Sequence, residues 1–300
     1  MAGSTVLILG GGWGGLTGAH LLRGSLPPEH RVVVVERKEV FSFCPSYLWL
    51  MTGERTTPKD VSRPLARLAH PGIEWVHEEV RAIDAAGLSV TTSAGRMQAD
   101  HIIIALGAEN APNEVPGFAE AAHDLYDAEG AIGIRNALSE FRGGRIVVLI
   151  TRTPFRCPGA PYESALLIDS FLRGRGTRDR AEIAVYTPEK QPLAVAGATV
   201  GQGVVEILKD HGIDYHPQRV ARRIDAVART VAFDEEEISY DLLVGIPPHR
   251  APAAVRESGL TDTTGYIPVH PQSLEILADP ETLATRYPRV HALGDITSIR

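Results

Sequence analysis

The sequence predicts an α/β protein with two Rossmann-like dinucleotide-binding domains, the first of which is split along the chain. A glycine-rich loop follows a short apolar strand near the N-terminus. A second apolar strand begins at Arg145, after a linker with Pro112 and Pro116, and a Pro-Pro pair at 247–248 marks a return. We therefore expect residues 1–111 to form the first part of one domain, residues 112–246 a second domain, and residues 247–300 to return to the first.

Size and composition agree with two ordinary domains. The chain has 300 residues, of which 44% are hydrophobic, and this is enough for two cores. A net charge of -7 without a long run of Lys or Arg argues against nucleic acid as a partner. The sequence has no apolar stretch of the roughly 20 residues that a spanning helix needs, and no signal-peptide pattern precedes the first strand. We expect a cytoplasmic protein that at most touches a membrane surface.

The first unit of the chain reads strand, loop, helix, strand and acid. Residues 6–9 are an apolar strand, and Gly10-x-Gly12-x-x-Gly15 then fits the dinucleotide fingerprint, with Trp13 and Gly14 inside it. The helix that follows would point its N-terminus at a diphosphate. Glu36 lies 21 residues after Gly15, at the end of the strand at 31–36, where it can accept hydrogen bonds from a ribose. Arg37, the next residue, is also expected to bind the dinucleotide. The alternative is a glycine-rich loop beside a surface acid.

The rest of the first domain is expected to be mostly β structure. Residues 41–53 are irregular and rich in aromatic residues, and 61–69 have helical spacing. Short strands are expected at 73–76, 80–83, 89–92 and 101–105, the last of which leads into Ala105-Leu106-Gly107.

The second domain starts like the first but lacks a second glycine fingerprint. Strands are predicted at 145–150 and 182–186, helices at 161–173 and 200–211, and closing strands at 220–224, 230–233 and 240–244. The segment 151–163 has one glycine and three prolines, so few backbone N–H groups are available for a diphosphate. Thr187-Pro188-Glu189 offers only a displaced acid for a ribose. Both observations disfavour NADH binding.

This same segment contains one of the two cysteines of the chain, Cys44 and Cys157. So few cysteines indicate a reducing compartment or a redox site. Cys157 lies close before a helix N-terminus and near Arg152 and Arg156, a setting that favours thiolate over thiol. The alternatives are a buried, small hydrophobic Cys157 and, at Glu163, an acid favoured by the helix dipole.

The segment Cys157-Pro-Gly-Ala-Pro-Tyr-Glu163 resembles the Cys-to-Glu signature of sulfide:quinone oxidoreductases and of the flavoprotein subunit of flavocytochrome c sulfide dehydrogenase. Phe-Ser-Phe-Cys-Pro-Ser at 41–46 resembles the loop after the ribose-binding acid of those families. Ala105-Leu106-Gly107 and Gly294-Asp295 resemble two further FAD-contacting segments of the wider glutathione-reductase-like class. The resemblance runs from the N-terminus to Asp295.

The resemblance implies FAD as the cofactor of the split first domain, and a degenerate NAD site in the second. Asp295 would reach the ribityl chain, the backbone at Val80 would meet the adenine, and Cys44 would pack against the cofactor. Cys157 would take up sulfide sulfur as a persulfide while electrons pass to FAD and then to a quinone or another carrier. Glu163 would accept or donate a proton.

The pattern departs from these families at its end. Their second redox cysteine, a helix after the Gly-Asp turn and the region that admits quinone lie beyond Asp295, and we expect all three to be missing here. Cys44 is a less favoured substitute for the partner thiol. Two alternatives stay open: an NAD(P)H-oxidising flavoprotein that resembles type II NADH dehydrogenases, and a non-catalytic FAD-binding protein. The sequence predicts no metal ligands, and it does not indicate the oligomeric state.

Overall fold

The computed structural model describes residues 3–68 and 70–298, and the chain divides into two compact units. Unit 1 contains Met1–Phe41, Arg63–Glu109 and Arg250–Arg300, and unit 2 contains Ser42–Ser62 and Asn110–His249. The segment Ser42–Ser62 therefore departs from the expected division, because it clusters with unit 2 and not with the N-terminal part. The strands β10 (Glu109–Asn110) and β19 (His249–Arg250) lie at the other two passages between the units.

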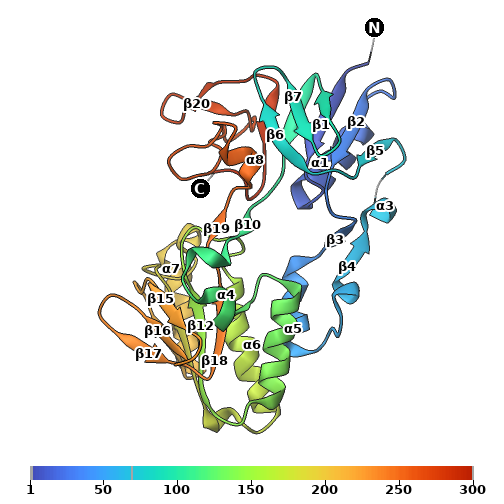
Figure 1. The fold of residues 1–300 in the computed structure, drawn as a ribbon. Coiled ribbons are helices and arrows are strands. Elements are labelled where there is room, and N and C mark those ends of the chain that lie inside the picture. Colours follow the sequence, from blue (N-terminus) through green and yellow to red (C-terminus); the bar gives the residue numbers. More distant parts are fainter. Residues whose placement is uncertain (1–2, 69, 299–300) are drawn as a thin grey trace. The chain divides into compact units, whose positions relative to one another are not determined.

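Unit 1 is built on a parallel sheet of five strands in the order β22-β9-β1-β2-β5 (Figure 1). Alternate residues of β1 and β2 enter two cores: Leu7 and Val33 lie in one, while Ile8 and Val34 pack in the other with Ala19 of the helix α1. Both faces of the sheet are covered, which explains why these strands are continuously apolar. The five strands and the helix are β1 (Thr5–Leu9), β2 (Arg31–Val35), β5 (Ile73–Val76), β9 (His101–Ile104), β22 (Val290–Ala292) and α1 (Trp13–Ser25).

Smaller elements complete unit 1. An antiparallel sheet is formed by β6 (Val80–Asp84), β7 (Ser89–Thr92) and β8 (Arg96–Gln98), and α8 (Ala253–Arg256) contacts β6. A second hairpin is formed by β20 (Leu277–Asp279) and β21 (Ala284–Thr285), and β3 (Val40–Ser42) pairs with β4 (Ser62–Pro64).

The prediction of a helix at 61–69 is wrong for most of this range. Val61 ends the 3-10 turn η2 (Pro58–Val61), β4 follows, and only α3 (Leu65–Leu68) is α-helical, while Ala69 lies outside the described residues. Pro64 explains the break, because the residue before a proline is pushed towards extended backbone.

Unit 2 has its own parallel sheet of five strands, in the order β11-β18-β12-β13-β14. An antiparallel sheet of β15, β16 and β17 lies within the same unit. The elements of unit 2 are α2 (Tyr47–Thr52), α4 (Phe118–Ala121), β11 (His123–Asp124), α5 (Ala128–Glu140), β12 (Gly144–Ile150), α6 (Ala160–Gly174), β13 (Ala181–Tyr186), α7 (Ala198–Asp210), β14 (Ile213–His216), β15 (Arg223–Asp225), β16 (Thr230–Ala232), β17 (Glu237–Ser239) and β18 (Leu242–Ile246), with the 3-10 turns η1 (Cys44–Ser46), η3 (Pro112–Glu114), η4 (Arg178–Arg180) and η5 (Ala194–Ala196).

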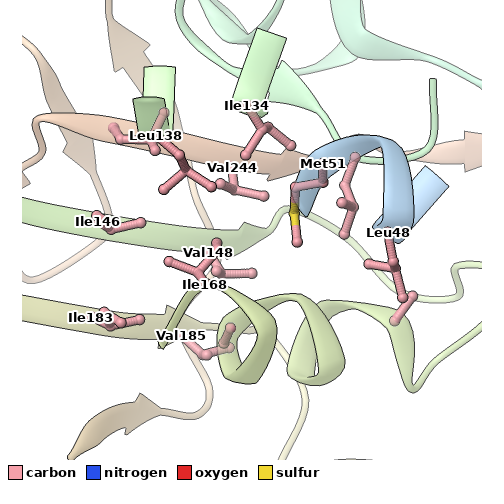
Figure 2. Close-up of a cluster of buried hydrophobic side chains, with 14 of the residues drawn as sticks. Leu48, Met51, Ile134, Leu138, Ile146, Val148, Ile168, Ile183, Val185 and Val244 are labelled. Carbon is pink, nitrogen blue, oxygen red and sulfur yellow. The ribbon is translucent and has the colours of Figure 1, made fainter. Parts of the chain in front are cut away.

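The main core of unit 2 explains why Ser42–Ser62 belongs to it. Leu50 and Met51 of α2 are fully buried, and α2 contacts both α5 and α6. Figure 2 shows Met51 beside Ile134 and Val244 in this core. Burial of these α2 side chains fixes the segment to unit 2.

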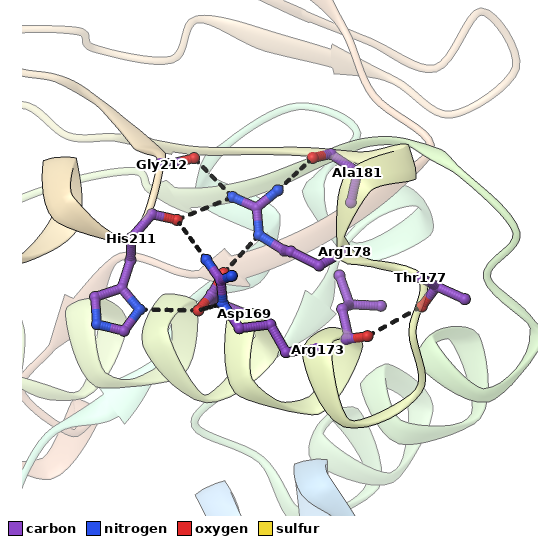
Figure 3. A network of polar contacts seen from close by, with 8 residues as sticks. Asp169, Arg173, Thr177, Arg178, Ala181, His211 and Gly212 are labelled. Carbon is purple, nitrogen blue, oxygen red and sulfur yellow. Dashed lines mark hydrogen bonds and ion pairs between the residues drawn. The ribbon is translucent and has the colours of Figure 1, made fainter.

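A network of ion pairs and hydrogen bonds connects the C-terminal half of α6 to the segments that follow it (Figure 3). Its centre is Asp169, whose side chain is 1% exposed and accepts hydrogen bonds from Arg173 Nε at 2.8 Å and Arg178 Nε at 2.5 Å. His211 Nδ1 lies 2.9 Å from the same carboxylate.

Among the described residues, no helix is long and apolar enough to cross a membrane.

Candidate functional site

The residues predicted to hold a dinucleotide gather at one edge of the unit 1 sheet. The glycine loop follows β1, Glu36 and Arg37 follow β2, Ala105-Leu106-Gly107 follow β9, and Gly294-Asp295 follow β22. These four strands are parallel neighbours, so their carboxyl ends meet at the same edge. Open α/β sheets bind their ligands at this edge.

Two glycines of the loop are required by close backbone approach. Gly10 has φ +103°, and a Cβ there would lie 2.4 Å from the carbonyl oxygen of Ala105. A Cβ at Gly15 would lie 1.8 Å from the carbonyl oxygen of Gly10. These contacts bring the first turn of α1 against the end of β1.

Gly12 is different, because its surroundings are open. A Cβ at Gly12 would meet no atom within 4 Å, and Gly12 caps α1 without a side-chain hydrogen bond to the first amides of the helix. At Gly14 a Cβ would instead lie 2.1 Å from Leu293 Cδ1, so that position is filled from within the fold. The uncapped N-terminus beside the open space at Gly12 fits a diphosphate.

Glu36 completes this arrangement through the backbone. Its Oε2 accepts a hydrogen bond from the N–H of Gly11 at 2.7 Å, and its Oε1 accepts one from the N–H of Lys38 at 2.8 Å. Each carboxylate oxygen has a second lone pair for a ribose hydroxyl. Arg37 forms ion pairs with Glu79 at 2.9 Å and Glu109 at 3.2 Å, so its charge is compensated within unit 1.

The other predicted cofactor residues of unit 1 differ in exposure. Trp13 is 53% exposed and packs edge-to-face on Phe41, with 5.1 Å between ring centroids. Asp295 is exposed in the turn that follows β22, and Val80 is half-buried at the start of β6. Among the described residues, no metal-binding group of three or more His, Cys, Asp or Glu side chains is present.

Cys44 belongs to unit 2, whereas the glycine loop belongs to unit 1. The Cys44 Sγ lies 3.6 Å from the carbonyl oxygen of Ser42, and the side chain is half-buried in η1. Burial, and then the neighbouring Cys44 thiol, raise the pKa of Tyr47 to about 12.

Cys157 lies at the carboxyl edge of the unit 2 sheet. It is exposed, follows β12 and comes three residues before α6. Its backbone is left-handed, with φ +49°, which is unusual for a residue with a side chain. The Cys157 carbonyl accepts hydrogen bonds from the hydroxyl of Tyr126 at 2.9 Å and from the N–H of Ala160 at 3.0 Å.

The two arginines near Cys157 in sequence hydrogen-bond to different partners, and the acid Glu163 is exposed. Arg152 Nη1 donates to the carbonyl oxygens of Thr151 at 2.7 Å and Ala221 at 2.9 Å. Arg156 Nη2 donates to Asn110 Oδ1 at 2.9 Å. Glu163 is exposed in the first turn of α6 and so can exchange a proton with solvent.

The acid that follows β13 faces the interior of unit 2. Glu189 Oε2 accepts a hydrogen bond from the hydroxyl of Tyr162 at 2.5 Å and one from Thr187 Oγ1 at 3.1 Å. Burial raises the pKa of Glu189 above its usual value. This carboxylate is engaged within the fold at the place where a nucleotide-binding domain needs a ribose partner.

Sequence reasoning missed Asn110, Asp124, Tyr126 and His249, which share this edge with Cys157. His249 follows β18, which pairs with β12, and Tyr126 follows β11, the edge strand that pairs with β18. These residues come together because β11, β18 and β12 are consecutive strands of the sheet. The order of the strands in the sheet cannot be read from their order in the sequence.

Comparisons with known proteins fit this geometry. The family model described as pyridine nucleotide-disulphide oxidoreductase matches residues 4–149. The model described as the central part of the sulfide dehydrogenase [flavocytochrome c] flavoprotein chain matches residues 133–247. The mitochondrial sulfide:quinone oxidoreductase of Mus musculus is 25% identical over 309 residues, which is 98% of this chain and 66% of that protein. The chain is thus similar to sulfide:quinone oxidoreductases over nearly its whole length, and FAD is the cofactor of such flavoproteins.

Other relatives agree in fold and differ in name. The sulfide-quinone reductase of Aquifex aeolicus is 27% identical over 85% of this chain and 60% of that protein. The solved structure of the Aquifex aeolicus sulfide:quinone oxidoreductase has a TM-score of 0.84 at 22% identity and covers 99% of this chain and 69% of that one, which confirms the predicted fold class. An alternative NAD(P)H-ubiquinone oxidoreductase of Arabidopsis thaliana is 26% identical over 98% of this chain and 62% of that protein. The chain spans 60 to 66% of the length of these curated relatives.

Proposed function

We propose that this chain provides the FAD-binding and sulfide-oxidising parts of a sulfide:quinone oxidoreductase-like enzyme. The observation that carries the proposal is the exposed Cys157, placed at the carboxyl edge of a parallel sheet and within a Cys-to-Glu motif of that family. The open space at Gly12 and the uncapped start of α1 support a diphosphate site, with Glu36 as the ribose partner.

The residues have distinct parts in this proposal. Bound FAD supplies an acceptor for two electrons. The Cys157 thiolate would receive sulfide sulfur: a sulfur–sulfur bond would form, an S–H bond of hydrosulfide would break, and bound FAD would be the oxidant that takes up the two electrons released. Glu163 accepts the released proton and passes it to solvent. Asp295 and the backbone of Ala105-Leu106-Gly107 would orient the cofactor, together with Trp13 and Val80.

The electrons then pass to a quinone or a similar carrier. Because quinones dissolve in the lipid phase, this step takes place at a membrane surface. The acceptor site is expected in the part of the family pattern that lies beyond Asp295.

NAD(P)H oxidation is the second candidate, because two relatives from Arabidopsis thaliana are named as NAD(P)H-ubiquinone oxidoreductases. Two features of unit 2 oppose it. Glu189 is held by Tyr162 and Thr187, and the turn after β12 contains prolines that lack the N–H groups a diphosphate would need.

An anaerobic reduction experiment separates the candidates. The purified chain is loaded with FAD and mixed with sulfide or with NADH, and the visible absorbance of the flavin is followed. We expect sulfide to bleach the flavin of the wild type and of Ser170→Ala, an exposed position on α6, but not of Cys157→Ser, which should keep its FAD. Bleaching by NADH and not by sulfide would refute the proposal. A flavin that neither donor reduces would support a non-catalytic FAD-binding protein.

A further inference from the structure

A group of polar side chains lies behind Cys157 in unit 2, and the proposed chemistry does not use it. Its members come from segments that are far apart in the sequence and reach the same edge of the sheet through β11, β18 and β12. They are Asn110, Asp124, Tyr126, Arg156 and His249.

Hydrogen bonds close this group into a ring. Asp124 Oδ1 accepts from the backbone N–H of Tyr126 at 2.8 Å, and Asp124 Oδ2 accepts from Asn110 Nδ2 at 2.7 Å. Asn110 Oδ1 in turn accepts from Arg156 Nη2 at 2.9 Å. The same Nη2 donates to the carbonyl oxygen of Tyr126 at 3.2 Å, so the ring returns to its start.

The ring fixes the side chain of Tyr126 as well as its backbone. The Arg156 guanidinium lies 5.3 Å from the centroid of the Tyr126 ring, and the His249 ring packs edge-to-face on it at 5.2 Å. Tyr126 is 8% exposed. These contacts fix the ring so that its hydroxyl donates a hydrogen bond to the carbonyl oxygen of Cys157.

Cys157 needs such a restraint. A left-handed backbone is disfavoured at a residue with a Cβ, and it persists where the surroundings fix it. The Cys157 carbonyl accepts hydrogen bonds from the N–H of Ala160 and from the hydroxyl of Tyr126. The bond from Ala160 lies within the turn that leads into α6, whereas the bond from Tyr126 comes from outside that turn.

We propose that Tyr126 is a positioning residue for Cys157. Its hydroxyl holds the Cys157 carbonyl in the left-handed turn and so keeps the exposed Cys157 in place close before the N-terminus of α6. The proposal rests on the proposed function for the reaction of Cys157, but the presentation of the thiol can be measured without that reaction.

The protonation states of the neighbours fit this role. Burial, and then the Cys157 thiol, raise the pKa of Tyr126 above its usual value, so the hydroxyl stays a hydrogen-bond donor at neutral pH. Burial raises the pKa of Asp124 to about 6, and burial and Arg156 lower the pKa of His249 to about 4. The titratable and charged groups around the turn are Asp124, Tyr126, Arg152, Arg156, Glu163, Glu189 and His249.

The test is the rate at which iodoacetamide alkylates Cys157 in the full chain, measured from pH 5 to 9 by mass spectrometry of the peptide that contains it. A thiol that leaves its place before the N-terminus of α6 loses stabilisation of its thiolate. We expect Tyr126→Phe to move the rate profile to higher pH and to slow alkylation at pH 7 roughly tenfold. Tyr240→Phe is the matched control, because it also removes the hydroxyl of a buried tyrosine in unit 2, 3.4 Å from the carbonyl oxygen of Asp225.

A second variant covers the case in which Tyr126→Phe does not fold. Asn110→Ala opens the ring without touching the tyrosine, and we expect a shift in the same direction with roughly threefold slower alkylation at pH 7. Profiles that coincide with those of the wild type and Tyr240→Phe, in whichever of the two variants folds, overturn the positioning role.

Flavin reduction separates this proposal from the proposed function. We expect sulfide to reduce the flavin of Tyr126→Phe roughly tenfold more slowly at saturating sulfide than that of Tyr240→Phe, with equal FAD content. If sulfide fails to reduce even the wild type while the alkylation profile still shifts, the proposed function is overturned and the positioning role is supported.

Discussion

Replacing Asp169 by Asn is expected to destabilise unit 2, the unit that carries Cys157. The carboxylate of Asp169 is 1% exposed and receives Arg173, Arg178 and His211 at 2.8, 2.5 and 2.9 Å. An amide at this position would keep one acceptor oxygen and turn an NH₂ group towards one of these donors. Breaking a buried ion pair at one partner costs about 3–5 kcal/mol, and we expect a loss of that size in the free energy of unfolding at pH 7.

The same carboxylate sets a pH dependence of known sign. Burial alone would raise the pKa of Asp169, but hydrogen bonds from Arg173, His211 and Arg178 outweigh it and lower the pKa from 3.8 to about 2. A depressed folded-state pKa stabilises the fold above the unfolded value near 3.8, and this contribution is lost as the pH falls towards 2. A shift of this size corresponds to about 2 kcal/mol.

Urea unfolding, followed by hydrogen–deuterium exchange in peptides from α6 and β13, reports on unit 2 separately from unit 1. The wild type should lose about 2 kcal/mol between pH 5 and pH 2 through this group, and Asp169→Asn should lack that loss. Asp210→Asn, an exposed acid on α7, is the matched control and should behave as the wild type. Equal unfolding free energies for Asp169→Asn and Asp210→Asn at pH 7 would refute the reasoning.

Two further predictions concern unit 2. Burial raises the pKa of Asp124 to about 6, so the free energy of unfolding should rise as the pH falls from 7 to 5, and urea titrations of Asp124→Asn should lack this rise; the same slope in both proteins would contradict the assignment. Met51 is fully buried in the core of unit 2, so Met51→Ala should lower the free energy of unfolding by about 2–5 kcal/mol, whereas the exposed Trp49→Ala should cost less than about 1 kcal/mol; equal losses would show that α2 does not anchor Ser42–Ser62.

The elements that were predictable from the sequence are local ones. The glycine loop, the strand that ends at Glu36 and the Ala-Leu-Gly and Gly-Asp segments are each recognisable within a few residues. Parallel sheets then place them together, because consecutive strand ends share one edge. The break at Pro64 also follows a local rule, because a proline pushes the preceding residue towards extended backbone even where apolar residues have helical spacing.

The features that could not be predicted depend on contacts between distant segments. Residues 42–62 lie between two segments of the first domain in sequence but bury Leu50 and Met51 in unit 2, and periodicity does not indicate which core receives an apolar helix. Tyr126 reaches Cys157 because β11, β18 and β12 are neighbours in the sheet, although β18 comes nearly a hundred residues after β12. Glu189 is turned inwards by Tyr162, a contact that depends on how α6 packs.

We propose that the amides at the start of α1 hold the diphosphate of FAD, and the FAD content of two glycine variants measures whether they do. A Cβ meets nothing within 4 Å at Gly12 or at Gly18, which lies farther along the same helix, so Gly12→Val and Gly18→Val should both keep the fold. Purified in parallel, Gly18→Val should retain FAD at the wild-type ratio of flavin to protein, and Gly12→Val should be nearly colourless with an unchanged circular dichroism spectrum. Wild-type flavin content in Gly12→Val would contradict the account.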